Sequence, residues 1–315
     1  MTLAFDKQEF EVRIDRVIAA LERHGLDTLV VTEPENICYL SGFWTPGYHV
    51  FQALVVSRWR DPFLVVRNIE MDSVETKSAV TKAYQITNLD LSLQTFAEAL
   101  QAEGVATGRI GLEVDGAKNT MVRVDRLGEL VPGATFVPSL GLVETFRAVK
   151  SADEIGYMRE AISKAESALR AGAASYGTAR TDGDVAAAVY GALAASGSEF
   201  TGSPAYVVEG VASARTHTLH AQRPLDPQGH VWLEVSASVN RYHGVASRIA
   251  GTDIRGEIVK YFEASAAALQ AMIGAMRDGV PAGEVDAAGR AEADRHDAGR
   301  FWRNRAAYSL GLSFP

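Results

Sequence analysis

The sequence has a single cysteine and no long apolar run, and both absences restrict its class. Because Cys38 is the only cysteine, no disulfide can form within the chain, which fits a reducing compartment. The N-terminal MTLAFDKQEFEVRIDR carries acidic residues where a signal peptide needs basic and then apolar ones. No uninterrupted apolar run approaches the roughly 18 residues that span a bilayer. We therefore expect a cytoplasmic protein with no membrane partner.

The sequence also lacks a basic excess. It has 31 Lys and Arg residues against 39 Asp and Glu residues, a formal net charge of −8. Proteins that bind nucleic acid usually present a basic surface to the phosphates, so we expect no nucleic-acid partner. At 315 residues and 47% hydrophobic composition, the chain is long enough for two domains with separate cores.

Helix and strand signals alternate through the first half of the chain. Residues 8–24 place apolar side chains at helical spacing. Four short β-branched runs follow at 26–32, 51–57, 62–68 and 110–115 and predict strands. A second helix is predicted at 91–104, where Gly104 stops it. This alternation predicts an α/β domain over residues 1–146.

Two helices and then strands are predicted in the second half. Ser151 and Glu154 form a capping-box pattern at the start of a long helix, and Thr181 can cap a second helix that reaches Gly197. Strand-like segments follow at 204–210, 230–239 and 241–251. We interpret residues 147–315 as a second domain.

The helix pair is repeated later in the chain. Residues 154–197 and 257–299 share a long helix, a Gly-containing turn and a short Val- and Ala-rich helix. Such self-similarity suggests two copies of one unit related by a pseudo-twofold axis. The strand-rich residues 198–252 follow the first copy, whereas only residues 300–315 follow the second. We therefore expect the second domain to be incomplete at its C-terminus, without those strands and their contribution to a site.

Four of the seven histidines gather in a strand-rich segment with little Lys or Glu: His217, His220, His230 and His243. Such a group also arises by chance, and both interpretations stay open. His217 follows a strand-like segment, where an imidazole can act as a general acid and base if a substrate reaches it. Its neighbour His220 is expected to point elsewhere.

Glu234 and His243 lie on adjacent strand-like segments, so they can face one cavity across a hairpin. The alternative is a buried carboxylate that pairs with an arginine such as Arg248, because a buried charge needs a partner in either case. Divalent metals need several converging carboxylates and imidazoles, and Asp226 is the only other acid between residues 217 and 251. A two-metal cluster is therefore not expected, and only a single-metal site on two histidines stays open.

The chain resembles the creatinase and prolyl-aminopeptidase superfamily. The likeness rests on RAVKSADEIGYMREA (147–161), on the duplicated helix pair and on the spacing from the histidines to RYH (241–243). It covers essentially the whole chain. The resemblance implies a creatinase-type α/β N-terminal domain and an α+β pita-bread catalytic domain, here truncated at its C-terminus.

The resemblance also implies where metal ligands would lie. Metal-dependent peptidases of the superfamily carry two aspartates on the hairpin and a histidine in a later HGIGL-like motif. The matching positions here are Glu234, Val245 and Tyr308. Because Val245 and Tyr308 are not ligands of that type, the resemblance places the chain in the metal-independent branch, without a metal or other cofactor.

Within that branch the chain is similar to creatinases and ectoine hydrolases. His217 and Arg223 lie at the offsets from Glu234 found in both, and RYH-x-x-x-SR with the terminal YSLGLSFP is more like ectoine hydrolases. The implied function is hydrolysis of C–N bonds in small, nitrogen-rich amidine, guanidino or cyclic amide compounds. His217 would be catalytic, moving a proton from the attacking water to the leaving nitrogen. Glu234, Tyr242 and His243 would bind the substrate.

Members of the superfamily are usually homodimers in which the N-terminal domain of one subunit borders the site of the other. By that resemblance Tyr48, His49 and Gln52 are further substrate-binding residues. Two other functions compete with the implied one. A Xaa-Pro dipeptidase or aminopeptidase would need a divalent metal and is opposed by Val245 and Tyr308. A non-catalytic homologue would bind small molecules without cleaving them.

Overall fold

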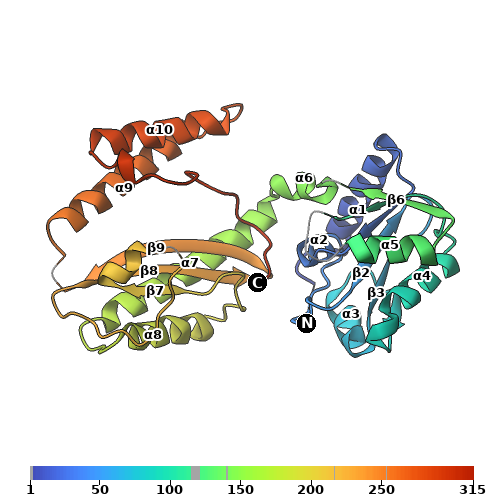
Figure 1. Ribbon diagram of the computed structural model, residues 1–315, viewed down its shortest axis with the longest axis horizontal. Coiled ribbons are helices and arrows are strands. Elements are labelled where there is room, and N and C mark those ends of the chain that lie inside the picture. The colour runs from blue at the N-terminus through green and yellow to red at the C-terminus, as the bar shows by residue number, and fades with distance from the viewer. Residues whose placement is uncertain (1–2, 115–120, 140, 216, 253) are drawn as a thin grey trace. The chain divides into compact units, whose positions relative to one another are not determined.

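The computed structural model describes residues 3–114, 121–139, 141–215, 217–252 and 254–315. The chain forms two compact units (Figure 1). The first unit reaches Ile155 and also includes Leu312–Phe314, and the second unit runs from Gly156 to Gly311. The division, between residues 155 and 156, falls nine residues after the boundary predicted at 146/147.

A six-stranded mixed sheet forms the centre of the first unit, in the order β4-β3-β2-β1-β5-β6. Its strands are β1 (Thr28–Val31), β2 (Ala53–Ser57), β3 (Phe63–Arg67), β4 (Ala83–Ile86), β5 (Gly108–Leu112) and β6 (Ala134–Pro138). Strand β2 is antiparallel to β1 and β3, whereas β1–β5, β5–β6 and β3–β4 are parallel pairs. Strands β1 and β2 are buried along their whole length, which explains their continuous apolar sequences.

Helices surround this sheet in the part of the first unit that the structure describes: α1 (Lys7–Arg23), α2 (Pro34–Ser41), α3 (Met71–Lys77), α4 (Ser92–Ala102), α5 (Met121–Leu130) and α6 (Leu142–Ala148). The predicted helices 8–24 and 91–104 are α1 and α4, and the four predicted strands are β1, β2, β3 and β5. The edge strands β4 and β6 were not predicted, because half-exposed edge strands carry no continuous apolar run.

A buried carboxylate joins β5 to the start of α2. Glu113 accepts hydrogen bonds from the backbone N–H groups of Thr32 at 2.6 Å and Glu33 at 2.8 Å, and from Asn36 Nδ2 at 2.6 Å. Burial raises the pKa of Glu113 to about 7, although these three donors act in the opposite direction. The group thus satisfies the free N–H groups at the helix start at a high desolvation cost.

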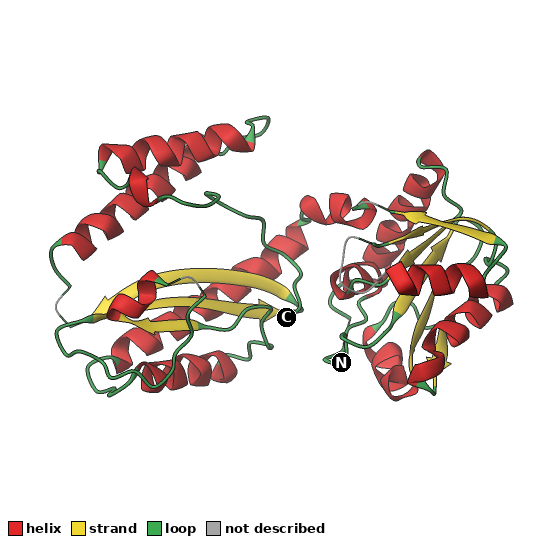
Figure 2. Ribbon diagram, in the orientation of Figure 1, coloured by secondary structure: helices red, strands yellow, loops and turns green. Residues whose placement is uncertain are grey.

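The second unit contains two helix pairs and a three-stranded antiparallel sheet in the order β7-β8-β9. Its elements are α7 (Ala152–Ser175), which starts in the first unit, α8 (Asp182–Ala195), β7 (Tyr206–Glu209), β8 (His230–Val239), β9 (Tyr242–Gly251), α9 (Glu257–Ala275) and α10 (Ala282–Arg295). Figure 2 shows α7 and α8 on one side of the sheet and the α9–α10 pair on the other. Both predicted helix pairs are present.

The capping residues predicted for α7 and α8 are confirmed. Ser151 and Glu154 exchange hydrogen bonds between side chain and backbone at 2.7 and 3.3 Å. Thr181 and Asp184 form the same reciprocal arrangement at the start of α8. Each box satisfies N–H groups that a helix start leaves without partners.

The core of the second unit lies between the sheet and the α7–α8 pair. Alternate residues of the strands enter it, among them Val207, Val231, Leu233, Val235 and Ala237. Helix α7 approaches β9 closely at Gly244, where a Cβ atom would lie 2.3 Å from the backbone nitrogen of Ile162. Glycine is therefore required at this crossing. In the described part of the chain, no helix is both long and apolar enough to cross a membrane.

Candidate active site

The sheet of the second unit presents a second face, opposite the α7–α8 core, which we call the outer face. Side chains alternate between the two faces along each strand, and the strand register assigns the members of each face. The outer face consists of Tyr206 and Val208 on β7, Trp232, Glu234, Ser236 and Ser238 on β8, and His243, Val245, Ser247 and Ile249 on β9. It therefore combines one carboxylate with hydroxyl, aromatic and aliphatic groups.

Glu234 is the carboxylate of the outer face. It pairs across the sheet with Tyr206 on one side and Ser247 on the other. Its side chain is half-buried, and this burial raises its pKa. Among the described residues no hydrogen bond or ion pair reaches it. The predicted alternative of a Glu234–Arg248 pair is wrong, because the Arg248 guanidinium donates to the Ser247 carbonyl at 2.8 Å.

Two aromatic rings lie beside Glu234. Trp232 precedes it by two positions on β8, and the ring of Tyr206 lies 6.0 Å from that of Trp232 at an interplanar angle of 33°. Both rings are partly exposed. The face of an aromatic ring attracts cations, as a carboxylate does. The outer face therefore places one carboxylate beside two partly exposed aromatic rings.

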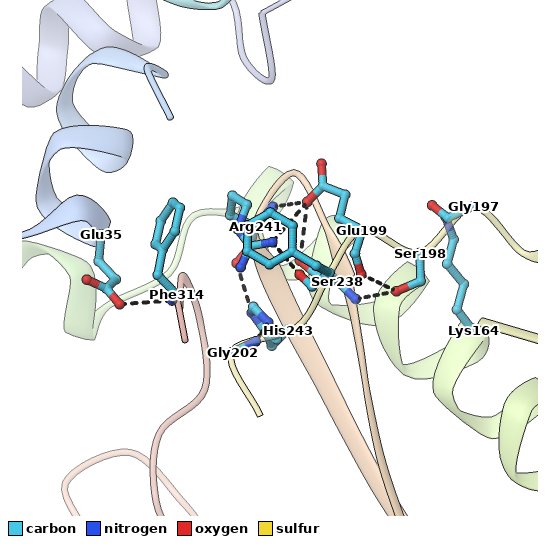
Figure 3. Close-up of polar contacts among 11 residues, drawn as sticks. Glu35, Lys164, Gly197, Ser198, Glu199, Gly202, Ser238, Arg241, His243 and Phe314 are labelled. Atoms are coloured by element: carbon cyan, nitrogen blue, oxygen red, sulfur yellow. Dashed lines mark hydrogen bonds and ion pairs between the residues drawn. The ribbon is translucent and has the colours of Figure 1, made fainter. Parts of the chain in front are cut away.

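The β8–β9 hairpin turns through Asn240 and Arg241, whose φ angles are 48° and 66°. Such left-handed pairs are typical of tight two-residue hairpins. The fully buried Arg241 donates its backbone N–H to Glu199 at 2.8 Å, and its guanidinium lies over the Phe200 ring at 4.0 Å and donates to the Phe200 carbonyl. Figure 3 shows how these contacts, with the Ser238–Ser198 hydrogen bond of 3.0 Å, fasten the turn to residues 198–202.

His243 lies at the end of the outer face next to this turn and is only 4% exposed. Its Nε2 accepts a hydrogen bond from Gly202 N–H at 2.9 Å, so Nδ1 carries the hydrogen and donates it to the Arg241 carbonyl at 2.9 Å (Figure 3). Burial, with a smaller effect of the Arg241 charge, lowers the pKa of His243 to about 4. Both ring nitrogens hold the loop and the turn, so the substrate contact predicted for His243 has no free polar atom in this arrangement.

The predicted catalytic residue, His217, is exposed and adopts a φ of 56°, a left-handed conformation that is uncommon outside glycine. The loop that follows it is fastened to the start of α8 by Asp182, whose side chain is fully buried. The Asp182 carboxylate accepts hydrogen bonds from the backbone N–H groups of Ala221 at 3.2 Å and Arg223 at 2.9 Å. It also binds the Arg223 guanidinium at 2.6 Å. A single buried acid thus holds the loop after His217.

His220 lies beside α8. Its ring lies 6.1 Å from that of Tyr190. Its Nδ1 is buried and has no hydrogen-bond partner among the described residues.

The other predicted substrate-binding residues lie elsewhere. Tyr242 is 2% exposed and stacks on Tyr157 of α7 at 5.9 Å, on the core side of the sheet, so packing accounts for it. Tyr48, His49 and Gln52 belong to the first unit. The ring of Tyr48 lies 5.4 Å from that of Phe314, His49 is exposed, and Gln52 is buried. Their role beside a partner subunit's site stays a prediction.

The residues present do not fit the pair of divalent metals on which the superfamily's peptidases depend. On the outer face Val245 pairs with Ser236, next to the Glu234–Ser247 pair, so a second carboxylate is replaced by an aliphatic side chain. Tyr308, at the position of the expected histidine, is 59% exposed. No group of three or more His, Cys, Asp and Glu side chains in the described ranges is arranged to hold a metal ion. A single-metal site on His217 and His220, which the sequence leaves open, has no third ligand of these types arranged beside it in the described residues.

Sequence reasoning missed three groups of residues at this site. Asp182 follows the predicted capping residue Thr181, and an acid in the first turn of a helix can reach a neighbouring loop. The contacts of Arg241 with Glu199 and Phe200 leave no local pattern, because they join segments that are far apart in the sequence. Trp232 could have been found from the sequence, because it lies two positions before Glu234 on a predicted strand and therefore on the same face.

Comparison with known proteins assigns the class. A model of the creatinase/prolidase N-terminal domain matches residues 13–149, and a model of metallopeptidase family M24 matches residues 156–315. With the observed fold, these matches confirm the predicted architecture of a creatinase-type N-terminal domain and a pita-bread domain, and place the protein in the creatinase and aminopeptidase P superfamily. The chain belongs to metallopeptidase family M24.

Its relatives include peptidases and peptidase-like proteins. The chain is 27% identical to an uncharacterized hydrolase/peptidase, y4tM, of Sinorhizobium fredii, over 99% of this chain and 83% of that protein. It is 22% identical to the putative dipeptidase YkvY of Bacillus subtilis, over 96% and 83%. A solved Xaa-Pro dipeptidase from Bacillus anthracis superposes with a TM-score of 0.83 at 18% identity, over 97% and 83%, which shows the shared fold.

These matches correct the function implied by the resemblance. Ectoine hydrolase of Halomonas elongata is 24% identical, but over only 51% of this chain and 43% of that enzyme. By contrast, the putative dipeptidase YkvY and the probable dipeptidase PepE of Mycobacterium bovis match over 96% and 98% of this chain. The assignment to metal-independent hydrolysis of amidine, guanidino or cyclic amide compounds is therefore wrong, and the peptidase alternative is the better supported one. The error arose because Val245 and Tyr308 were taken to define the branch, and the short RYH-x-x-x-SR motif with the offsets of His217 and Arg223 was then taken to define the substrate class.

Proposed function

We propose that this protein hydrolyses short peptides, and that Xaa-Pro and other dipeptides are its substrate class. The observation that carries the proposal is that similarity to dipeptidases extends over 96% of the chain and through both units, whereas similarity to ectoine hydrolase covers about half of it. Similarity that extends through both domains is a better guide to the substrate class than similarity that covers about half of the chain.

Within this proposal His217 is the proton-transfer group. An exposed imidazole beside a bound peptide can take a proton from the attacking water and return it to the leaving amine. Asp182 holds the later part of the same loop through its hydrogen bonds with Ala221 and Arg223. Glu234 is the substrate-binding group of the outer face.

A second candidate is favoured by one specific observation. Because Val245 and Tyr308 occupy positions where the superfamily's peptidases carry metal ligands, the chain fits a homologue that binds short peptides without cleaving them. Both candidates use the same outer face, and they differ in turnover alone.

The experiment is to incubate the purified protein with a dipeptide panel that includes Ala-Pro, Gly-Pro, Ala-Ala and Leu-Gly. Parallel samples contain Mn²⁺ or a chelator, and released amino acids are measured by chromatography. Cleavage of any dipeptide that is lost in His217→Ala supports the proposed hydrolysis. Binding of dipeptides by calorimetry without release of amino acids supports the second candidate. If the protein neither cleaves nor binds any dipeptide of the panel, both the proposed hydrolysis and the second candidate are contradicted.

The predicted homodimer is retained as part of the proposal, because Tyr48 and His49 are partly or fully exposed in the first unit. Light scattering on the purified chain tests it. A mass of one chain, 33.9 kDa, at all concentrations would contradict it.

A further inference from the structure

Helix α9 carries a row of apolar side chains on an exposed side. Phe262, Leu269, Ile273 and Met276 are each between 47% and 52% exposed, and Ala266 among them is exposed as well. Along the helix these residues follow one another at intervals of four, three, four and three. This alternation lines side chains up on one side of a helix, and it is the spacing by which two helices pack along a common seam. We call these five residues the α9 stripe.

The α9 stripe does not face the helix that α9 contacts within the chain. The buried residues of α9 are Ala264, Ala268 and Met272. Met272 lies against Gly289 of α10, where an added Cβ atom would come within 2.7 Å of its side chain. Figure 1 shows the two helices side by side. The stripe is therefore a second apolar side of α9, and within the described residues it stays exposed.

Comparison with α7, the counterpart of α9 in the internal repeat, shows that this helix position does not require an apolar exposed side. Residues 154–176 and 257–279 align without a gap, so that the buried Ala161, Ala165 and Leu169 match the buried residues of α9. The positions of the α9 stripe match Arg159, Ser163, Glu166, Arg170 and Ala173. Four of these five are polar, as is usual for the solvated side of a helix. The apolar stripe is specific to α9, and such an exposed row marks a contact surface.

The charges beside the stripe identify its partner. Glu263, Gln270 and Arg277 recur at intervals of seven and so line one flank of the stripe. Neither Glu263 nor Arg277 has a hydrogen-bond or ion-pair partner for its side chain among the described residues. When two copies of α9 are antiparallel and related by a twofold axis, this flank faces itself in reverse order. Glu263 then lies beside Arg277 of the second copy, whereas a parallel pair would keep the two charges about 21 Å apart along the axis.

The same antiparallel register matches the stripe residues by size. With Gln270 next to Gln270 of the second copy, Leu269 packs against Ile273 of that copy. The small Ala266 lies opposite the large Met276 of that copy. Because the axis is twofold, each of these contacts occurs twice, as in other isologous interfaces.

We infer that α9 packs antiparallel against α9 of a second copy of this chain, through the α9 stripe and with Glu263 and Arg277 paired across the twofold axis. The inference goes beyond the proposed hydrolysis, and it gives the proposed homodimer a contact surface.

Sedimentation velocity on the whole chain between about 1 and about 100 µM tests the inference. The wild type should be a dimer at the upper end of this range. Leu269→Lys places a charge at the centre of the stripe and should raise the dissociation constant at least about tenfold. Because Leu269 is half exposed in the single chain, the variant should stay folded, which circular dichroism melts at the lowest concentration verify.

Charge reversal tests the antiparallel register. Glu263→Arg and Arg277→Glu each place like charges side by side, so either substitution alone should weaken the dimer several-fold. The double variant exchanges the two charges and should return the dissociation constant to within about twofold of the wild type. Glu160→Arg is the matched control, because Glu160 is the exposed residue of α7 that corresponds to Glu263. It should leave the dissociation constant unchanged.

Three results would overturn the inference. They are the mass of one chain, 33.9 kDa, at every concentration, a dimer that Leu269→Lys does not weaken, and a double variant that associates no more tightly than the single variants. The first result would also contradict the proposed homodimer, whereas the second would contradict this surface and leave a homodimer through another surface intact. The proposed hydrolysis is read separately, from the amino acids that each variant releases from dipeptides.

Discussion

The fully buried carboxylate of Asp182 binds the Arg223 guanidinium at 2.6 Å and accepts the backbone N–H of the same residue at 2.9 Å. One acid at the start of α8 thereby fixes both the main chain and the side chain of a loop that begins at His217. Removal of Asp182 would therefore change the candidate catalytic loop without removing any group proposed to contact the substrate.

Asp182→Ala should destabilise the second unit by about 3 kcal/mol, because it leaves a guanidinium and two N–H groups without their acceptor. Urea denaturation measures the loss. Asp278→Asn, an exposed acid between α9 and α10, is the control and should change the free energy of unfolding by less than about 0.5 kcal/mol. Equal effects of the two substitutions would show that Asp182 does not hold the loop.

His243 should make stability fall in mild acid. Its pKa is about 4 in the folded protein, whereas the ordinary value is 6.5, so the unfolded chain takes up a proton first as the pH decreases. The contribution of neutral His243 is present above about pH 6.5 and is lost between 6.5 and 4. From pH 7 to pH 5 the loss is about 2 kcal/mol. Urea melts of the wild type and His243→Asn at both pH values measure it, and the variant should lack this part of the pH dependence.

Glu113 should give stability a pH dependence of the opposite sign to that of His243, with stability lost as the pH rises. Its pKa is raised to about 7 from 4.5, so the folded protein retains a proton that the unfolded chain releases. Its contribution to stability is full below about pH 4.5 and falls as the pH rises to 7. The free energy of unfolding of the wild type, relative to Glu113→Gln, should decrease by roughly 2–3 kcal/mol between pH 5 and pH 8. A difference between the two proteins that does not change with pH would contradict the assigned pKa.

Two glycine-to-alanine substitutions should change the free energy of unfolding in opposite directions. Gly244→Ala places a methyl group 2.3 Å from the Ile162 backbone nitrogen, where neither strand nor helix can move freely, and should cost roughly 3 kcal/mol or more. Gly274→Ala, in α9 with no atom within 4 Å of the new methyl group, should stabilise by about 0.5–1 kcal/mol. Thermal melts check both. A neutral Gly244→Ala would contradict the close approach of α7 to β9.

The sequence predicts the fold more completely than the site. Helices α1, α4, α7 and α8 have caps or a clear apolar period, and β1, β2, β3 and β5 have continuous apolar runs, so local pattern and final structure agree. Strands β4 and β6 are not predicted from the sequence, because half-exposed edge strands have neither caps nor a continuous apolar run.

The site depends on contacts between distant segments. The adjacent strand-like segments predict that Glu234 and His243 face the same side of the hairpin, and both lie on the outer face. The sequence could not show that both nitrogens of His243 would be used by Gly202 and Arg241, because these bonds arise when residues 198–202 fold over the hairpin. The substrate class was misjudged for another reason: neither two substituted ligand positions nor a short motif on the hairpin specifies the bond that is cleaved.

The account is tested most directly by a crystal structure of the protein with Ala-Pro, grown in the presence of chelator and again with Mn²⁺. It predicts that the dipeptide lies on the outer face, beside Glu234, in both crystals. A dipeptide bound away from the outer face in both crystals would contradict it.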